Sequence, residues 1–128
     1  MNQGLTDEAW GYSTTLLKFD QSEFIEYGWG SSGLRSKGWL FYPDICATTQ
    51  CNLVVWLHGG GAFAPYYLQY PENGFGSIAA ANNIIILFPQ GDMYYGPTNC
   101  FDLVNPGYTG TDNWSHDGVQ VKSIMKMV

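Results

Sequence analysis

The amino-acid sequence predicts an α/β fold, with a mostly parallel sheet and flanking helices. Two unbroken apolar runs carry this prediction, LVVWL at residues 53–57 and IIILF at residues 84–88. Strands of a parallel sheet are covered on both faces, so they form continuous apolar runs rather than an alternating pattern. Burial of such side chains stabilises a fold by roughly 1.5–3 kcal/mol each. We therefore expect these two strands at the centre of the core.

A helical pattern between the two runs completes a strand–helix–strand unit. Phe75, Ile78 and Ala79 recur at helical spacing. Pro71 stands at the expected start of this helix, and asparagines follow its last apolar residue. A third strand is predicted for the aromatic run GWLFYP at residues 38–43, where proline ends it. The segment before that strand is irregular and polar apart from LLKFDQSEFI.

The last segment predicts an amphipathic helix. Its apolar residues recur at i, i+3, i+4 and i+7, namely Val121, Ile124, Met125 and Val128. Ser115 or Asp117 is placed to cap the start of this helix. The helix reaches the last residue without a stop signal. We expect residues 1–128 to be the N-terminal part of one larger domain.

Composition excludes several classes of function. The chain has 128 residues, of which 45% are hydrophobic and 12% charged, and its net charge is −6. A chain of this composition folds as a small globular domain rather than staying disordered. The negative charge argues against a nucleic-acid partner. No basic run suits an anionic membrane, and no apolar run is long enough for a membrane span.

Cysteine spacing and a sequon point to an extracellular protein. Cys46 and Cys51 enclose a four-residue turn suited to a local disulfide, although two free buried thiols are the alternative. Asn113 begins a glycosylation sequon. The N-terminus lacks the features of a signal peptide, so we expect the numbering to start at a mature or internal residue. Cys100 is then either buried or paired outside this sequence.

The segment His58 to Gly61 is the strongest candidate for chemistry. A loop after a parallel strand lies at the carboxyl edge of the sheet, where open α/β folds place their sites. Consecutive glycines let backbone N–H groups face a ligand, and HGGG loops supply oxyanion donors in esterases. The alternative is a glycine-rich connection with a structural histidine. Nucleotide binding is improbable because neither GxGxxG nor GK[ST] occurs.

The second histidine, His116, lies between a serine and an aspartate, the residue types of a catalytic triad. Ser115, His116 and Asp117 are contiguous, and contiguous residues cannot converge as a triad does. We expect a solvated helix start, with Asp117 favourable to the helix dipole. Metal binding is disfavoured because HExxH and CxxC spacings are absent. We expect no cofactor and no metal.

Several sequence blocks together resemble the polyhydroxybutyrate depolymerase-like esterases. The blocks run in order from Phe19 to Val128: FDQSEFI, SSGLRSKGWLFYPDIC, CNLVVWLHGGG, ANNIIILFPQ, NCFDLVNPGYTG and DGVQVKSIMKMV. The resemblance implies an α/β-hydrolase fold, secretion, and hydrolysis of carboxylic esters through a serine acyl-enzyme. It implies that the loop from His58 to Gly61 lines the oxyanion hole. It also implies that Cys46 and Cys51 are paired.

Two departures from the family pattern stand out. Gly60 occupies a position where family members commonly have cysteine, so a bridge toward Cys100 is lost. The GxSxG nucleophile elbow is absent from the chain, and neither Ser31 nor Ser32 sits in such an elbow. The resemblance implies that the nucleophile, the acid and the base follow Val128.

These observations lead to one main hypothesis and two alternatives. The main hypothesis is the oxyanion-hole half of a secreted esterase acting on a polyester or another carboxylic ester. Backbone N–H groups of Gly60 and Gly61 stabilise the oxyanion, and His58 shapes the loop. The first alternative is a non-catalytic structural or assembly subunit, in which another chain or the missing C-terminal half covers an exposed sheet edge. The second is an esterase on plant polysaccharide esters.

Overall fold

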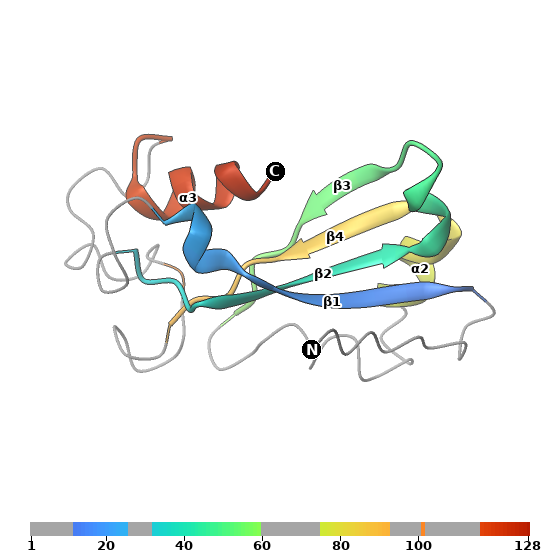
Figure 1. Ribbon diagram of the computed structural model, residues 1–128, viewed down its shortest axis with the longest axis horizontal. Coiled ribbons are helices and arrows are strands. Elements are labelled where there is room, and N and C mark those ends of the chain that lie inside the picture. The colour runs from blue at the N-terminus through green and yellow to red at the C-terminus, as the bar shows by residue number, and fades with distance from the viewer. Residues whose placement is uncertain (1–11, 26–31, 60–74, 93–100, 102–115) are drawn as a thin grey trace.

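A four-stranded mixed sheet forms the body of the protein (Figure 1). The computed structural model describes residues 12–25, 32–59, 75–92, 101 and 116–128. The strands lie in the order β1-β2-β4-β3. Their bounds are β1 Thr14–Asp20, β2 Lys37–Pro43, β3 Asn52–Val55 and β4 Ile84–Phe88. Short 3-10 helices follow β1 and β2, η2 at Gln21–Phe24 and η3 at Asp44–Ala47.

The described sheet is not mostly parallel, which corrects the prediction. β1 pairs antiparallel with β2, and β2 pairs antiparallel with β4. Only β3 and β4 run parallel, as expected for two strands joined through a helix. The prediction was wrong because the apolar runs identify only that parallel pair. The strand β1 was not predicted at all, although its threonines and aromatic residue suit a strand.

The position of β3 also differs from the prediction. The strand ends at Val55, two residues earlier than the apolar run, and among the described residues it pairs with β4 alone. Side chains of Leu53, Val54 and Val55 are 37–40% exposed. Within the described sheet, β3 is therefore an edge strand rather than the centre of the core. β4, by contrast, has the predicted bounds and lies inside the sheet.

The main core lies between one face of the sheet and α2 (Phe75–Ala81). Leu16, Phe41 and Ile86 occupy registered positions on adjacent strands, so their side chains share this face. Ala79 of α2 and Phe88 complete the buried cluster. The end of α2 confirms the prediction from asparagine: Asn83 has a left-handed φ of 53°, and Asn82 Nδ2 donates to the Ile78 carbonyl. Pro71 lies outside the described residues.

The C-terminal helix α3 (Val119–Met127) forms as predicted but presents a different face to the protein. It lies beside η2 at one end of the sheet (Figure 1). Gln120, Ser123 and Ile124 are its buried residues, whereas Met125 and Val128 are 63% exposed. The predicted apolar face was therefore wrong in part. Ile124 packs in a second cluster that includes two residues from elsewhere in the chain, Leu34 and Phe101.

The predicted cap of α3 is corrected as well. The N-cap residue is Gly118, which as a glycine has no side chain to cap the helix. Asp117 instead lies within ion-pair distance of His116 and Lys122. Ser115 lies outside the described residues. A carboxylate held by two neighbouring side chains still stands near the helix N-terminus, where its charge is favourable.

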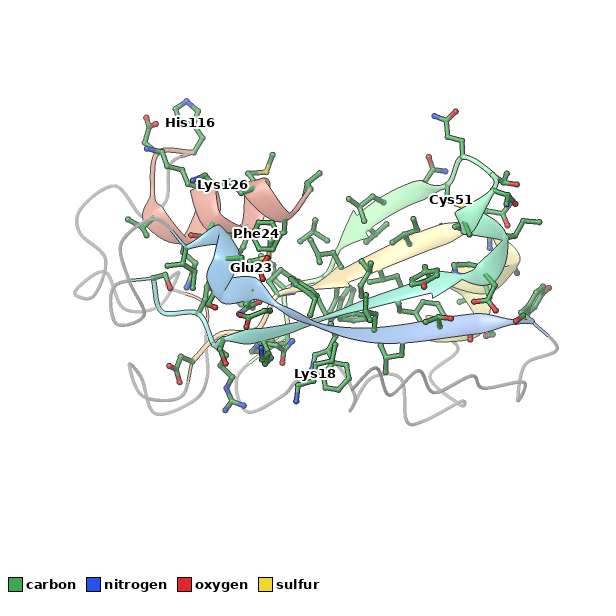
Figure 2. All side chains as sticks on the ribbon, in the orientation of Figure 1. Lys18, Glu23, Phe24, Cys51, His116 and Lys126 are labelled. Carbon is green, nitrogen blue, oxygen red and sulfur yellow. A yellow bond between two sulfur atoms is a disulfide. The ribbon has the colours of Figure 1, made fainter. Side chains whose placement is uncertain are left out.

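Cys46 and Cys51 form a disulfide, which confirms the local pairing and excludes the alternative of two free thiols. The bridge closes the turn between η3 and β3. Figure 2 labels Cys51 at the β3 end of this turn. Cys100 lies outside the described residues. In the described part of the chain, no helix has both the length and the apolarity needed to cross a bilayer.

Candidate functional site

His58 is buried at the carboxyl end of β3, in the segment that begins the HGGG loop. Only 5% of its surface is exposed. Its Nε2 accepts a hydrogen bond from the backbone N–H of Gly91 at 3.1 Å. Because Nε2 accepts, the ring proton resides on Nδ1, which donates to the Gly59 carbonyl at 2.8 Å. Both ring nitrogens are therefore engaged within the protein.

Burial lowers the pKa of His58 below its usual value of 6.5. The positive charge of Arg35 lowers it further, and the hydrogen bond to Gly59 opposes these effects. The imidazole is therefore neutral at pH 7. With Nε2 occupied by Gly91, the ring is not free to take a proton from a nucleophile in this arrangement.

The loop after His58 continues into the predicted oxyanion donors. Gly60 and Gly61 lie outside the described residues, and the structure tests neither. Gly59 is described, and a Cβ built on it meets nothing within 4 Å. Packing among the described residues therefore does not require glycine at this position. Phe101 lies against the other side of the histidine, with ring centroids 4.8 Å apart.

A buried glutamine pair fixes the segment that contacts His58. Gln21 Nε2 donates to the carbonyls of Arg35 and Gln90, at 2.5 and 2.8 Å. Gln21 Oε1 accepts from the backbone N–H of Gln90 at 3.1 Å. These bonds fix the backbone next to Gly91, whose N–H contacts His58. The pair thus links η2 to the residues that follow β4.

A turn before β2 is joined to the same segment. Leu34 and Gly91 form an isolated antiparallel bridge, and Asp92 N–H donates to the Gly33 carbonyl at 2.8 Å. Gly33 has a φ of +65°, a conformation that favours glycine. Ser32 is fully buried, and its hydroxyl accepts from the backbone N–H of Leu34. This serine forms a local turn, which agrees with its exclusion as a nucleophile.

The sequence analysis missed Gln21, Gln90 and Gly91 as supports of the site. One signal was available for the last two. They follow β4 directly, and the carboxyl ends of two adjacent parallel strands meet at the same sheet edge. Residues after β4 must therefore lie beside the HGGG loop. No pattern in the sequence signals the role of Gln21.

His116 is separate from this site. It lies just before α3, and 86% of its side-chain surface is exposed. Its Nδ1 lies 3.1 Å from Asp117 Oδ2. Figure 2 shows it projecting from the outer end of the helix. The interpretation as a solvated helix start is confirmed. Asn113 lies outside the described residues.

No metal site is assembled in the part of the chain that the structure describes. There, no three His, Cys, Asp or Glu side chains come together in a way that could hold a metal ion.

Comparison with known proteins gives a consistent result. No family model matches the chain. A curated polyhydroxybutyrate depolymerase from Talaromyces funiculosus is 31% identical over 132 residues, which cover 91% of this chain and 37% of that protein.

Solved structures agree. A PHB depolymerase variant complexed with an R3HB trimer superposes with a TM-score of 0.67 and 27% identity, over 98% of this chain and 41% of that one. The crystal structure of PHB depolymerase from Penicillium funiculosum gives a TM-score of 0.66 and 26% identity, with the same coverage. The chain thus spans well under half the length of the proteins it matches. These findings confirm the resemblance drawn from the sequence: the chain is similar to polyhydroxybutyrate depolymerases over most of its length.

Proposed function

We propose that this chain supplies the oxyanion-hole part of a secreted serine esterase that hydrolyses a polyester of hydroxy acids. The observation that carries the proposal is the fixed, neutral His58 at the carboxyl edge of the parallel strand pair. Similarity to polyhydroxybutyrate depolymerases supports the substrate class. The complete domain is then an α/β-hydrolase, of which residues 1–128 are a part.

The proposed role of His58 is to shape the loop rather than to transfer a proton. Its two hydrogen bonds join the loop after β3 to the residues after β4. Gly60 and Gly61 follow at once, and their backbone N–H groups are the proposed donors to the tetrahedral oxyanion. The nucleophilic serine, its base and the acid come from sequence outside this chain.

Secretion is part of the proposal. A disulfide between Cys46 and Cys51 suits an oxidising compartment. Glycosylation at Asn113 belongs to the same expectation.

The first experiment tests for a serine nucleophile. A fluorophosphonate probe should label the complete native protein and should fail to label residues 1–128 alone. If the folded complete protein resists the probe and leaves a 3-hydroxybutyrate trimer intact, the enzyme proposal fails. The outcome would then favour a non-catalytic subunit. Faster cleavage of feruloyl or acetyl esters than of the trimer would shift the substrate to plant polysaccharides.

A second experiment tests the backbone donors. Gly60→Pro removes an N–H group, whereas Gly60→Ala keeps it, so the pair compares the loop without and with this donor. We expect Gly60→Pro to lower kcat by about 10²–10³ relative to Gly60→Ala. The same comparison applies to Gly61. Equal kcat values for the proline and alanine variants would show that the backbone N–H of that glycine does not stabilise the oxyanion.

A further inference from the structure

A basic cleft lies at the same end of the sheet as His58. Its volume is about 290 Å³. The lining residues are Lys18, Arg35, Ser36, Lys37, Trp39 and Gln90. They come from the end of β1, the start of β2 and the segments beside it, and the exit of β4. Figure 2 shows Lys18 on the side of the sheet away from α3.

The cleft concentrates positive charge in an acidic protein. The whole chain has 5 lysines and arginines and a net charge of −6, yet three of those cations line this cleft. One of them is already paired, because Lys37 Nζ contacts Asp20 Oδ2. Hydrogen bonds from Lys37 and Ser22 lower the pKa of Asp20 to about 2, so the Asp20 carboxylate is ionised at neutral pH. Lys18 and Arg35 provide the remaining charge.

The two remaining cations are held without an acidic partner among the described residues. Lys18 Nζ stands 5.3 Å from the centre of the Trp39 ring, a cation–π contact. The Arg35 backbone is fixed from both sides, since its N–H donates to Gln90 and its carbonyl accepts from Gln21. Its guanidinium has no hydrogen-bonding acceptor in the described part of the chain. Because its backbone is fixed and its guanidinium N–H groups have no acceptor among the described residues, Arg35 is suited to bind a planar anion.

The cleft is connected to the proposed oxyanion loop. Gln90 lines the cleft, and the next residue, Gly91, donates to His58. The charge of Arg35 also reaches His58, where it contributes to the lowered pKa. A ligand group bound in the cleft therefore lies against the segment whose next residue, Gly91, is bonded to His58.

We propose that this cleft binds the free carboxylate of a short hydroxy-acid oligomer, or of the acid that hydrolysis releases. The inference rests on the proposed function, since it assigns a binding site for one end of that substrate. Arg35 binds the carboxylate through two N–H groups, and Lys18 adds charge. Trp39 offers an apolar surface to the methyl-bearing carbon chain. The uncharged ester bonds stay outside the cleft.

Calorimetry on the complete protein tests the site without requiring turnover. The probes are 3-hydroxybutyrate and the acid dimer, compared with 3-hydroxybutyramide, which is uncharged and resists an esterase. We expect the acids to bind about tenfold more tightly than the amide, because the amide lacks the negative charge that strengthens the hydrogen bonds from Arg35. Arg35→Gln should weaken acid binding about tenfold and leave amide binding unchanged. Lys126→Gln, a basic residue in the last turn of α3, is the matched control.

Several outcomes would overturn the inference. Equal affinity for acid and amide would do so, as would equal losses in Arg35→Gln and Lys126→Gln. Inorganic phosphate that binds as tightly as the acid dimer would indicate a general anion site instead. Acid-selective binding in a protein that resists the fluorophosphonate supports the cleft but refutes the esterase. Labelling by the fluorophosphonate and hydrolysis of the trimer, without preference for the acid over the amide, support the esterase but refute the cleft.

Discussion

Gly91 donates its backbone N–H to Nε2 of His58 across 3.1 Å, and this bond joins the loops that follow two parallel strands. The donor is a backbone group and therefore cannot change its protonation state. It determines the tautomer of the histidine, which in turn donates from Nδ1 to Gly59. The conformation at the start of the HGGG loop thus depends on the backbone after β4.

Loss of the His58 ring should destabilise the protein. His58→Ala leaves the buried Gly91 N–H without its acceptor, at a cost of about 1–3 kcal/mol in the free energy of unfolding. His116→Ala, at an exposed histidine, should change that free energy by less than about 0.5 kcal/mol. Urea unfolding of the complete protein measures both. Equal effects at the two histidines would contradict the assigned bond.

Acid should weaken the same contact. Since the pKa of His58 is below 6.5 in the folded state, the unfolded chain takes up its proton first as the pH falls. The stability that neutral His58 provides is complete above pH 6.5 and is lost as the pH falls through the lowered folded value. Melting temperatures between pH 7.5 and 5 should show this decline. A His58→Gln variant should lack that part of the decline, and a His116→Gln variant should retain it.

Substitution of Gln21, the buried residue of η2, should destabilise the protein. Gln21→Leu removes three hydrogen bonds and leaves the carbonyls of Arg35 and Gln90 without a side-chain donor. We expect a loss of about 1–3 kcal/mol in the free energy of unfolding. Gln50→Leu, at an exposed residue, is the matched control. In the complete esterase, Gln21→Leu should also lower kcat. The Gln90 backbone loses its bonds to Gln21, so the neighbouring Gly91 is no longer held against His58. An unchanged kcat would limit Gln21 to stability.

Gly38 and Gly59 should respond to alanine to different extents. A Cβ on Gly38 would lie 2.7 Å from Gln21 Oε1 and 2.8 Å from the Phe19 ring, so Gly38→Ala crowds the sheet beside the site. We expect it to cost about 1–3 kcal/mol. Gly59→Ala adds a methyl group that meets no described residue within 4 Å, and it should change stability by less than about 0.5 kcal/mol. Thermal or urea unfolding of both variants decides the comparison, and similar losses would refute the local packing.

Local patterns predicted some elements well and others poorly. β4 and the end of α2 follow from a continuous apolar run and from asparagine, which act through neighbouring residues. The predicted face of α3 was partly wrong because hydrogen bonding determined its orientation: Gln120 Nε2 donates to the Ser32 carbonyl at 3.0 Å. Periodicity counts apolar residues and ignores such a bond. β1 and the edge position of β3 depend on sheet pairing, which no single segment encodes.

The residues of the candidate site likewise differ in whether the sequence alone could identify them. His58 was identified because a strand followed by glycines is a local signal. Gln21 was missed because its partners are distant in sequence and because a glutamine among polar residues has no distinctive pattern. Arg35 could be recognised only when the sheet placed it next to Lys18 and Trp39. Residues that act through long-range contacts therefore need the structure.

The bond between Gln21 and Gln90 spans 69 residues, and this separation has a kinetic consequence. Closing so long a loop costs more chain entropy than forming any hairpin, so such contacts form late unless other contacts first shorten the path. Pairing of β1 with β2, and then of β2 with β4, brings the two glutamines together. The backbone at Gly91 reaches its final position only after that assembly, and the start of the HGGG loop follows it. Recovery of the site on refolding should therefore lag behind the recovery of secondary structure.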